Sequence, residues 1–232
     1  MEYARLQSML IAKIDPKYLL FCGPIVNAKT PLLGVRMPDL HEIAKKIIKD
    51  KDDVKTLPFH QSVEMDIVIG FCRMQSNDAL DDKYQFLNAF LPGVDNWMVI
   101  DSLASSFSTK DYGLGLRKIK QYAKSKAPFE RRFAYIHFLD NFIQKDKVND
   151  IFKIVKPDAH YYVKMAIAWL LCECFVRYPN ETEVYLANNV LDDWTINKAI
   201  LRAKKSALRS IVALKKLAYN LNRYSEKEKN NG

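Results

Sequence analysis

The chain has 232 residues, of which 49% are hydrophobic and 27% charged, and this composition is ordinary for a globular protein with a sizeable core. No apolar run approaches the roughly 20 residues of a membrane-spanning helix, and no N-terminal signal-peptide pattern is present, so we expect a cytoplasmic protein. The net charge is +9, and residues 194–232 carry +8 of it, because ten Lys or Arg there face only two Glu.

The pattern along the chain predicts helices and no sheet, because glycine and turn dipeptides are scarce and β-branched alternation hardly appears. Three helix starts carry local signals, namely Pro38 with Asp39, Pro128, and Asp193 as a cap. In chain order, the predicted helices cover residues 2–13, 15–23, 38–50, 60–74, 78–90, 96–107, 113–125, 129–144, 147–155, 161–178, 181–189 and 194–220.

Four strongly apolar helices recur with a regular spacing. The helices at 60–74, 96–107, 129–144 and 161–178 begin 36, 33 and 32 residues apart. This rhythm is typical of paired helices stacked as HEAT-like or TPR-like repeats, which curve and leave a concave surface. The sequence therefore predicts an all-α, HEAT-like helical-repeat solenoid, with one domain over residues 1–224 and a disordered tail at 225–232. A compact bundle is the alternative.

Three of these apolar helices carry polar and aromatic residues that a plain scaffold does not need. In NWMVIDS, Trp97 and Asp101 lie four residues apart and share a helix face, where a carboxylate in apolar surroundings is either paired or reactive. In FERRFAYIHF, Arg131 and Arg132 face different directions, so one can point inward toward a phosphate or carboxylate. Trp169 lies within YYVKMAIAWLLCECF. Taken singly, each has a plainer explanation: a locally bonded Asp, a surface arginine pair, or a core indole.

The last predicted helix carries a cationic stripe of Lys198, Arg202, Lys205 and Arg209 at helical spacing, which suits a polyanion. The alternative is a solvated helix face. Neither the four cysteines nor the four histidines have metal-ligand spacing, so we expect reduced packing cysteines and no metal. Phosphate-loop, hydrolase-elbow, zinc-protease and dinucleotide motifs are absent from the sequence, and no cofactor is expected.

Together with LLGVRMPDLHEIAKKI at 32–47 and LDDWTINKAI, these segments resemble the AlkD-type DNA alkylation repair glycosylases, which are built from HEAT-like repeats. The likeness extends from about residue 32 to about residue 198. It implies that Asp101 is the catalytic carboxylate and that Trp97 and Trp169 offer indole faces to the sugar and the lesion. It also implies that Arg131 or Arg132 holds a phosphate.

The resemblance implies a monofunctional glycosylase that acts on N3-alkyladenine and N7-alkylguanine in double-stranded DNA without base flipping. Nothing in the sequence suggests an obligate oligomer, so we expect a monomer. In one respect the sequence departs from the family, because no aromatic residue stands shortly before Leu33-Gly34, and Phe21 is the nearest substitute. Two other functions compete with a glycosylase: a non-catalytic HEAT-like module that binds DNA by shape and charge, and a protein-binding repeat scaffold.

Overall fold

The computed structural model describes residues 1–107, 111–144, 147–188 and 190–207. Over these ranges the chain forms α-helices, one short 3-10 helix and no β-strand, which confirms the all-α prediction for this part of the chain. A single isolated β-bridge between Ile14 and Val35 joins two loops. The helices divide into two compact units, residues 1–137 and the remainder of the chain.

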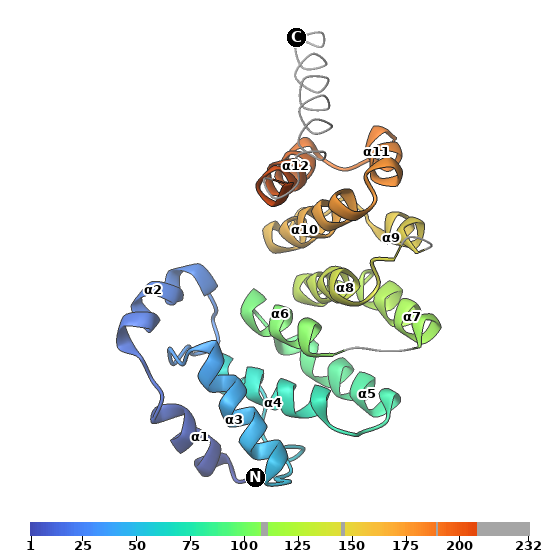
Figure 1. Cartoon of the computed structure of the whole chain (residues 1–232). Coiled ribbons are helices and arrows are strands. Elements are labelled where there is room, and N and C mark those ends of the chain that lie inside the picture. Colours follow the sequence, from blue (N-terminus) through green and yellow to red (C-terminus); the bar gives the residue numbers. More distant parts are fainter. Residues whose placement is uncertain (108–110, 145–146, 189, 208–232) are drawn as a thin grey trace. The chain divides into compact units, whose positions relative to one another are not determined.

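The first unit places one apolar helix at its centre. Its helices are α1 (Tyr3–Ile11), α2 (Pro16–Val26), α3 (Met37–Lys49), α4 (Val63–Gln75), α5 (Leu80–Phe90), the 3-10 helix η1 (Leu91–Gly93), α6 (Trp97–Ser106), α7 (Tyr112–Tyr122) and most of α8 (Pro128–Asn141) (Figure 1). Helix α4 is buried along almost its whole length and contacts both α3 and α6. A helix that is apolar on nearly every side needs neighbours on every side, and α4 has them.

Gly70 sets how closely α4 and α6 approach. A Cβ atom at this position would overlap the side chain of Leu103, which is fully buried on α6. Because glycine has no side chain, the two helices pack closely at this crossing. This contact fixes the position of α6 within the unit.

The second unit repeats the arrangement around another apolar helix. It contains α9 (Val148–Ile154), α10 (Tyr161–Arg177), α11 (Pro179–Ala187) and α12 (Asp193–Ala207). Helix α10 contacts α11 and α12, and nine of its residues are buried, so it is covered on most of its surface. In the first unit, apolar helices from successive predicted repeats pack on each other, α4 on α6, and in the second unit the apolar α10 packs on the amphipathic α12, as in a helical-repeat stack.

The predicted helices appear in the predicted order, with boundaries that differ by a few residues. Helix α2 was expected to end at residue 23, but it continues through Pro24 to Val26 and ends where Asn27 adopts the left-handed conformation (φ 49°). The proline removes only one helical hydrogen bond, whereas the Asn27 N–H still bonds to the Gly23 carbonyl. Residues 208–220 of the last predicted helix lie outside the described residues.

The cap of the last helix differs by one residue from the prediction. Asp193 is the first residue of α12, and Asp192 instead accepts hydrogen bonds from the Thr195 backbone N–H (3.1 Å) and hydroxyl (2.8 Å). A cap accepts the N–H three residues ahead, so Asp192 has the correct spacing. The two other signals are confirmed, because Pro128 starts α8 and Pro38 lies in the first turn of α3.

The four cysteines are free and buried, which confirms their packing role. None of the helices in the described ranges is long and apolar enough to cross a membrane. The single domain over residues 1–224 stays a prediction, because residues 208–224 lie outside the described part, as does the predicted tail at 225–232.

Candidate active site

Helix α6 carries Trp97 and Asp101 one turn apart, as the sequence predicted. The helix begins at Trp97 because the Asn96 side chain caps it, accepting the Val99 backbone N–H at 3.0 Å. The opposite face of α6 is anchored in the core by fully buried residues, among them Val99 and Leu103. Asp101 is therefore presented from a helix that is fixed at its start and along its buried side.

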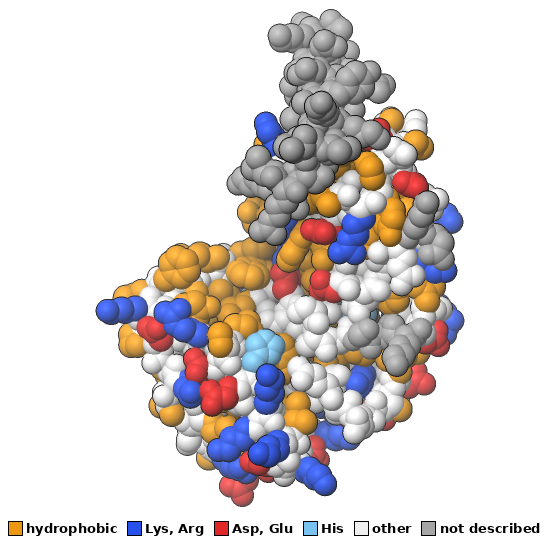
Figure 2. All heavy atoms as spheres, viewed as in Figure 1, with side chains coloured by type: hydrophobic (Ala, Val, Ile, Leu, Met, Phe, Trp, Pro, Cys, Tyr) orange, Lys and Arg blue, Asp and Glu red, His pale blue; other side chains and the backbone are white. Residues whose placement is uncertain are grey.

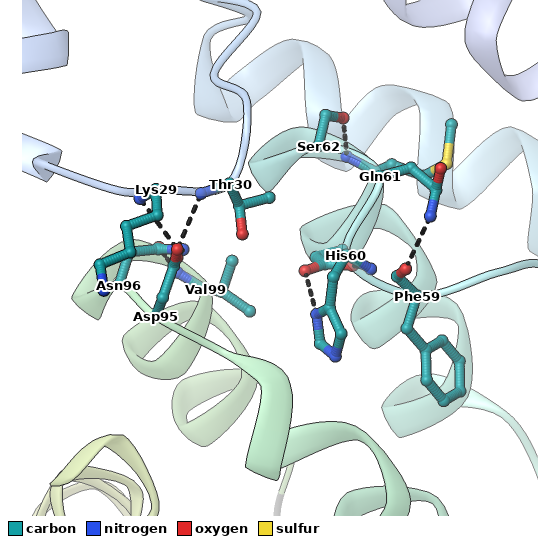
Figure 3. Close-up of polar contacts among 11 residues, drawn as sticks. Lys29, Thr30, Phe59, His60, Gln61, Ser62, Asp95, Asn96 and Val99 are labelled. Atoms are coloured by element: carbon teal, nitrogen blue, oxygen red, sulfur yellow. Dashed lines mark hydrogen bonds and ion pairs between the residues drawn. The ribbon is translucent and has the colours of Figure 1, made fainter. Parts of the chain in front are cut away.

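The Asp95 carboxylate ties the start of α6 to the segment that follows α2. One of its oxygens accepts the backbone N–H groups of Lys29 (2.8 Å) and Thr30 (2.7 Å) (Figure 3). Burial alone would raise the pKa of Asp95, but the bonds from Asn96, Thr30 and Lys29 outweigh it and lower the pKa below its usual value. Asp95 is thus a positioning carboxylate that stays ionised.

The indole N–H of Trp97 donates to the backbone carbonyl of Ile25 at 3.1 Å, near the end of α2. This bond orients the Trp97 ring. Phe21 lies one turn before Ile25 on α2, and both side chains are exposed, Phe21 to 68%. Leu20 is also exposed, and Figure 2 shows hydrophobic side chains gathered on the surface in the region of α2. The nearest substitute for the family's early aromatic residue therefore belongs to the helix that Trp97 contacts.

Asp101 is held by Arg132 from α8. Arg132 donates from Nε to Oδ1 (2.8 Å) and from one terminal nitrogen to Oδ2 (2.6 Å), a bidentate ion pair. The Arg132 side chain is 7% exposed and that of Asp101 is 20% exposed, so the pair lies at the edge of the core. Two short charge-assisted bonds in a partly desolvated site fix the carboxylate plane.

The neighbouring arginine points elsewhere. The Arg131 guanidinium donates to the backbone carbonyls of Ser125 and Lys126, both at 2.9 Å, in the loop after α7. The predicted divergence of the two arginines is thus present in the structure. Arg132 faces the Asp101 carboxylate, while Arg131 binds backbone carbonyls of the loop before α8.

His137 helps to seat α8 on α6. It is completely buried, its Nδ1 lies 3.3 Å from the Ala104 carbonyl, and its ring stacks on both Phe107 and Phe133. Burial lowers the pKa of His137 to about 4, although the Ala104 carbonyl opposes this shift. The neutral His137 ring therefore packs α8 against α6, five residues after Arg132 on the same helix.

In the second unit, the face of Trp169 is covered by a cation. The Arg202 guanidinium carbon lies 4.3 Å from the centroid of the Trp169 ring. Trp169 is on α10 and Arg202 is on α12, and these helices pack together. The apolar helix that carries Trp169 thus leaves this indole at its surface, next to the cationic stripe.

A second ring with two cations lies near the start of α12, and the sequence analysis did not single it out. Lys164 and Lys198 lie over the Trp194 ring at 4.6 and 5.4 Å. Lys164 also pairs with Asp192 at 2.8 Å. The signal that could have revealed this cluster is Trp194 four residues before Lys198 and eight before Arg202, which places all three on one helix face.

The structure thus brings Trp97, Asp101 and Arg132 together in the first unit, and Trp169 and Arg202 together in the second. Of the remaining stripe, Lys198 and Lys205 lie on α12 and Arg209 lies outside the described residues. Among the described side chains, no group of three or more metal-ligating residues comes together. The first unit therefore presents a carboxylate with an indole and an arginine, and the second unit presents an indole with a cation over its face.

Comparison with known families gives one match over most of the chain. Residues 6–202 match the model of the DNA alkylation repair enzyme family, a range that holds Trp97, Asp101, Arg132 and Trp169. A search of curated proteins finds no match. The match agrees with the family that the sequence motifs indicated and covers more than half of the chain. The chain therefore belongs to the family of DNA alkylation repair enzymes.

Proposed function

We propose that this protein is a monofunctional DNA glycosylase that hydrolyses the N-glycosidic bond of N3-alkyladenine and N7-alkylguanine in duplex DNA. It belongs to a family that repairs alkylated DNA. The observation that carries the finer proposal is the Asp101 carboxylate, partly desolvated and held by two bonds from Arg132, four residues after Trp97. A carboxylate held in this way suits a reaction that develops positive charge on a sugar.

Stabilising the positive charge on the sugar is the main task that this reaction leaves to the enzyme. The alkylated purine already carries a formal positive charge, so cleavage of the bond between C1′ and the base nitrogen returns an electron pair to the base, which leaves neutral. The deoxyribose gains oxocarbenium character at the same time. Asp101 stabilises this cation and orients the water that adds to C1′, and the proton released by that water passes to the Asp101 carboxylate and from there to solvent.

Arg132 is in this proposal a positioning residue. Its two bonds fix both oxygens of Asp101, so little reorganisation is needed when the sugar becomes charged. Phosphate binding, expected of Arg131 or Arg132, is then left to Arg131 and to the cations of the second unit.

The other residues bind the substrate. Trp97, oriented by its bond to the Ile25 carbonyl, and Trp169 offer indole faces to the sugar and to the cationic base. The stripe of α12 binds backbone phosphates without reading sequence, and the concave face of the repeats receives the duplex. A carboxylate presented from the surface of a helix suits an enzyme that does not rotate the base into a deep pocket. In this proposal the enzyme works as a monomer and without a cofactor.

A second candidate is a non-catalytic DNA-binding module, and one observation favours it. Both oxygens of Asp101 accept hydrogen bonds from Arg132, which is also the arrangement of an ion pair that only joins α6 to α8. The two candidates differ in whether Asp101 is needed for base release or for stability alone.

The test compares release of free 7-methylguanine from duplex DNA under single-turnover conditions by wild type, Asp101→Asn and the control Asp95→Asn. Asp95 is another ionised carboxylate at the same helix, but it bonds only the neighbouring loop and helix start. We expect Asp101→Asn to lower the release rate roughly 10²- to 10³-fold. Asp95→Asn should cost stability and leave the rate within a few-fold of wild type.

Circular dichroism at the assay temperature and DNA binding establish that each variant is folded. If the wild type releases no base while it binds DNA, the glycosylase proposal fails and the binding module replaces it. If Asp101→Asn releases base at the wild-type rate, Asp101 is a structural residue.

A further inference from the structure

Arg202 and Trp169 have separate roles in the proposed function, phosphate binding for Arg202 and lesion binding for Trp169, yet their side chains are in contact. The guanidinium carbon lies 4.3 Å from the ring centroid, which is within the range of a cation–π contact. Arg202 is exposed and Trp169 is partly buried, so the cation covers the indole from the solvent side. The face that is proposed to receive a cationic base already holds a cation.

The chemistry of this occupant resembles that of the ligand. A guanidinium is planar, delocalised and weakly hydrated, and it stacks on aromatic faces. An N7-alkylated guanine or N3-alkylated adenine is also a planar, delocalised monocation. Both satisfy the same electrostatic preference of the indole face, so they compete for it.

Arg202 is held less firmly than the other ring-bound cation of this unit. Lys164, over Trp194, is also anchored by the Asp192 carboxylate at 2.8 Å. Within the described part of the chain, the contact that the structure shows for Arg202 is the one with the Trp169 ring, and no carboxylate pairs with it. Displacing Arg202 therefore costs a single exposed cation–π contact.

We propose that the Trp169 face is a binding site for a planar monocation and that Arg202 is its resident occupant, which a charged alkylpurine must displace. This inference rests on the proposed function for the identity of the ligand. The displaced guanidinium remains on α12, where it belongs to the cationic stripe that is proposed to bind phosphates. Arg202 then has two roles. It contacts a phosphate, and it lowers the affinity of the Trp169 face for a lesion, because the lesion must first displace it.

The test titrates nitrogen-15-labelled protein with 7-methylguanosine in mildly acidic buffer, where its base is cationic, and with neutral guanosine. The chain has three tryptophans, so three indole N–H signals report the rings, and Trp→Phe variants assign them. The variants are Arg202→Ala, which uncovers Trp169, and Lys198→Ala as a matched control. Lys198 lies one turn earlier on the same helix, over Trp194, and carries the same charge.

We expect 7-methylguanosine to shift the Trp169 signal and to bind Arg202→Ala roughly 2- to 5-fold more tightly than wild type, the value of one exposed cation–π contact. Lys198→Ala should bind close to wild type at this ring, and guanosine should bind more weakly in every protein. If Arg202→Ala gains no affinity at Trp169, or if its signal does not respond, the inference is overturned.

The base-release assay separates this inference from the proposed function. Base release by wild type with no affinity gain in Arg202→Ala overturns the occupant role of Arg202 alone. An affinity gain without base release overturns the glycosylase and leaves Trp169 as a cation-binding site.

Discussion

His137 makes the packing of α8 on α6 sensitive to acid. The residue is fully buried between the Phe107 and Phe133 rings, and burial lowers its pKa from 6.5 to about 4. A histidine in the unfolded chain takes up a proton below its ordinary pKa, whereas His137 in the folded protein does not until the pH falls near 4. The unfolded state therefore binds more protons in this window, and the folded state loses stability as the pH falls.

The size of the effect follows from the shift. One pKa unit corresponds to about 1.4 kcal/mol, so the full shift of the His137 pKa is worth about 3 kcal/mol, and lowering the pH from about 7.5 to about 5 removes about 2 kcal/mol of it. This is a large part of the stability of an ordinary domain, about 5–15 kcal/mol.

The assay is urea unfolding followed by circular dichroism at several pH values, for wild type and for His137→Gln. Glutamine does not titrate and can still donate to the Ala104 carbonyl. Carboxylates contribute equally to both proteins, so the difference between the two pH profiles isolates His137. We expect the wild type to lose about 2 kcal/mol more than the variant over this range. Equal profiles, or a His137 ring signal that titrates near its ordinary pKa in the NMR spectrum, would refute the argument.

Two further predictions concern Arg132, which holds Asp101, and Glu64, which holds the loop at residues 33–35. Arg132→Lys replaces two parallel bonds to Asp101 with one and should slow base release roughly 10- to 100-fold in the single-turnover assay. Glu64→Gln should lower the free energy of unfolding by about 1.5–3 kcal/mol in urea titrations, because the buried Glu64 carboxylate accepts three backbone N–H groups of residues 33–35. Exposed Glu42→Gln is its control, and equal unfolding midpoints for the two would contradict this reasoning.

For the Leu33-Gly34 motif, the sequence pattern indicated a family but not a conformation. The sequence marked this stretch by its likeness to a family, and the structure gives the physical reason for its residues. Gly34 adopts a positive φ of 88°, and a Cβ there would lie 2.6 Å from the Cβ of Leu19. The Glu64 carboxylate then binds the N–H groups of this loop. Neither the loop conformation nor its partner on α4 could be read from residues 32–47 alone.

The candidate site divides in the same way. The spacing of Trp97 and Asp101 placed them on one helix face, and the adjacency of Arg131 and Arg132 made them point apart. That Arg132 is the partner of Asp101 depends on how α8 packs on α6, across 31 residues of sequence. The bond from Trp97 to the Ile25 carbonyl spans 72 residues, and no local pattern indicates it.

The sequence by itself determined the helical class, the order of the helices, the buried cysteines and the basic C-terminal segment, because helix periodicity and charge are local properties of the chain. Only the tertiary structure decided which arginine holds Asp101, which residue caps α12 and which cation covers Trp169. These pairings depend on the rotation and approach of packed helices, and small changes in either bring a different side chain to the interface.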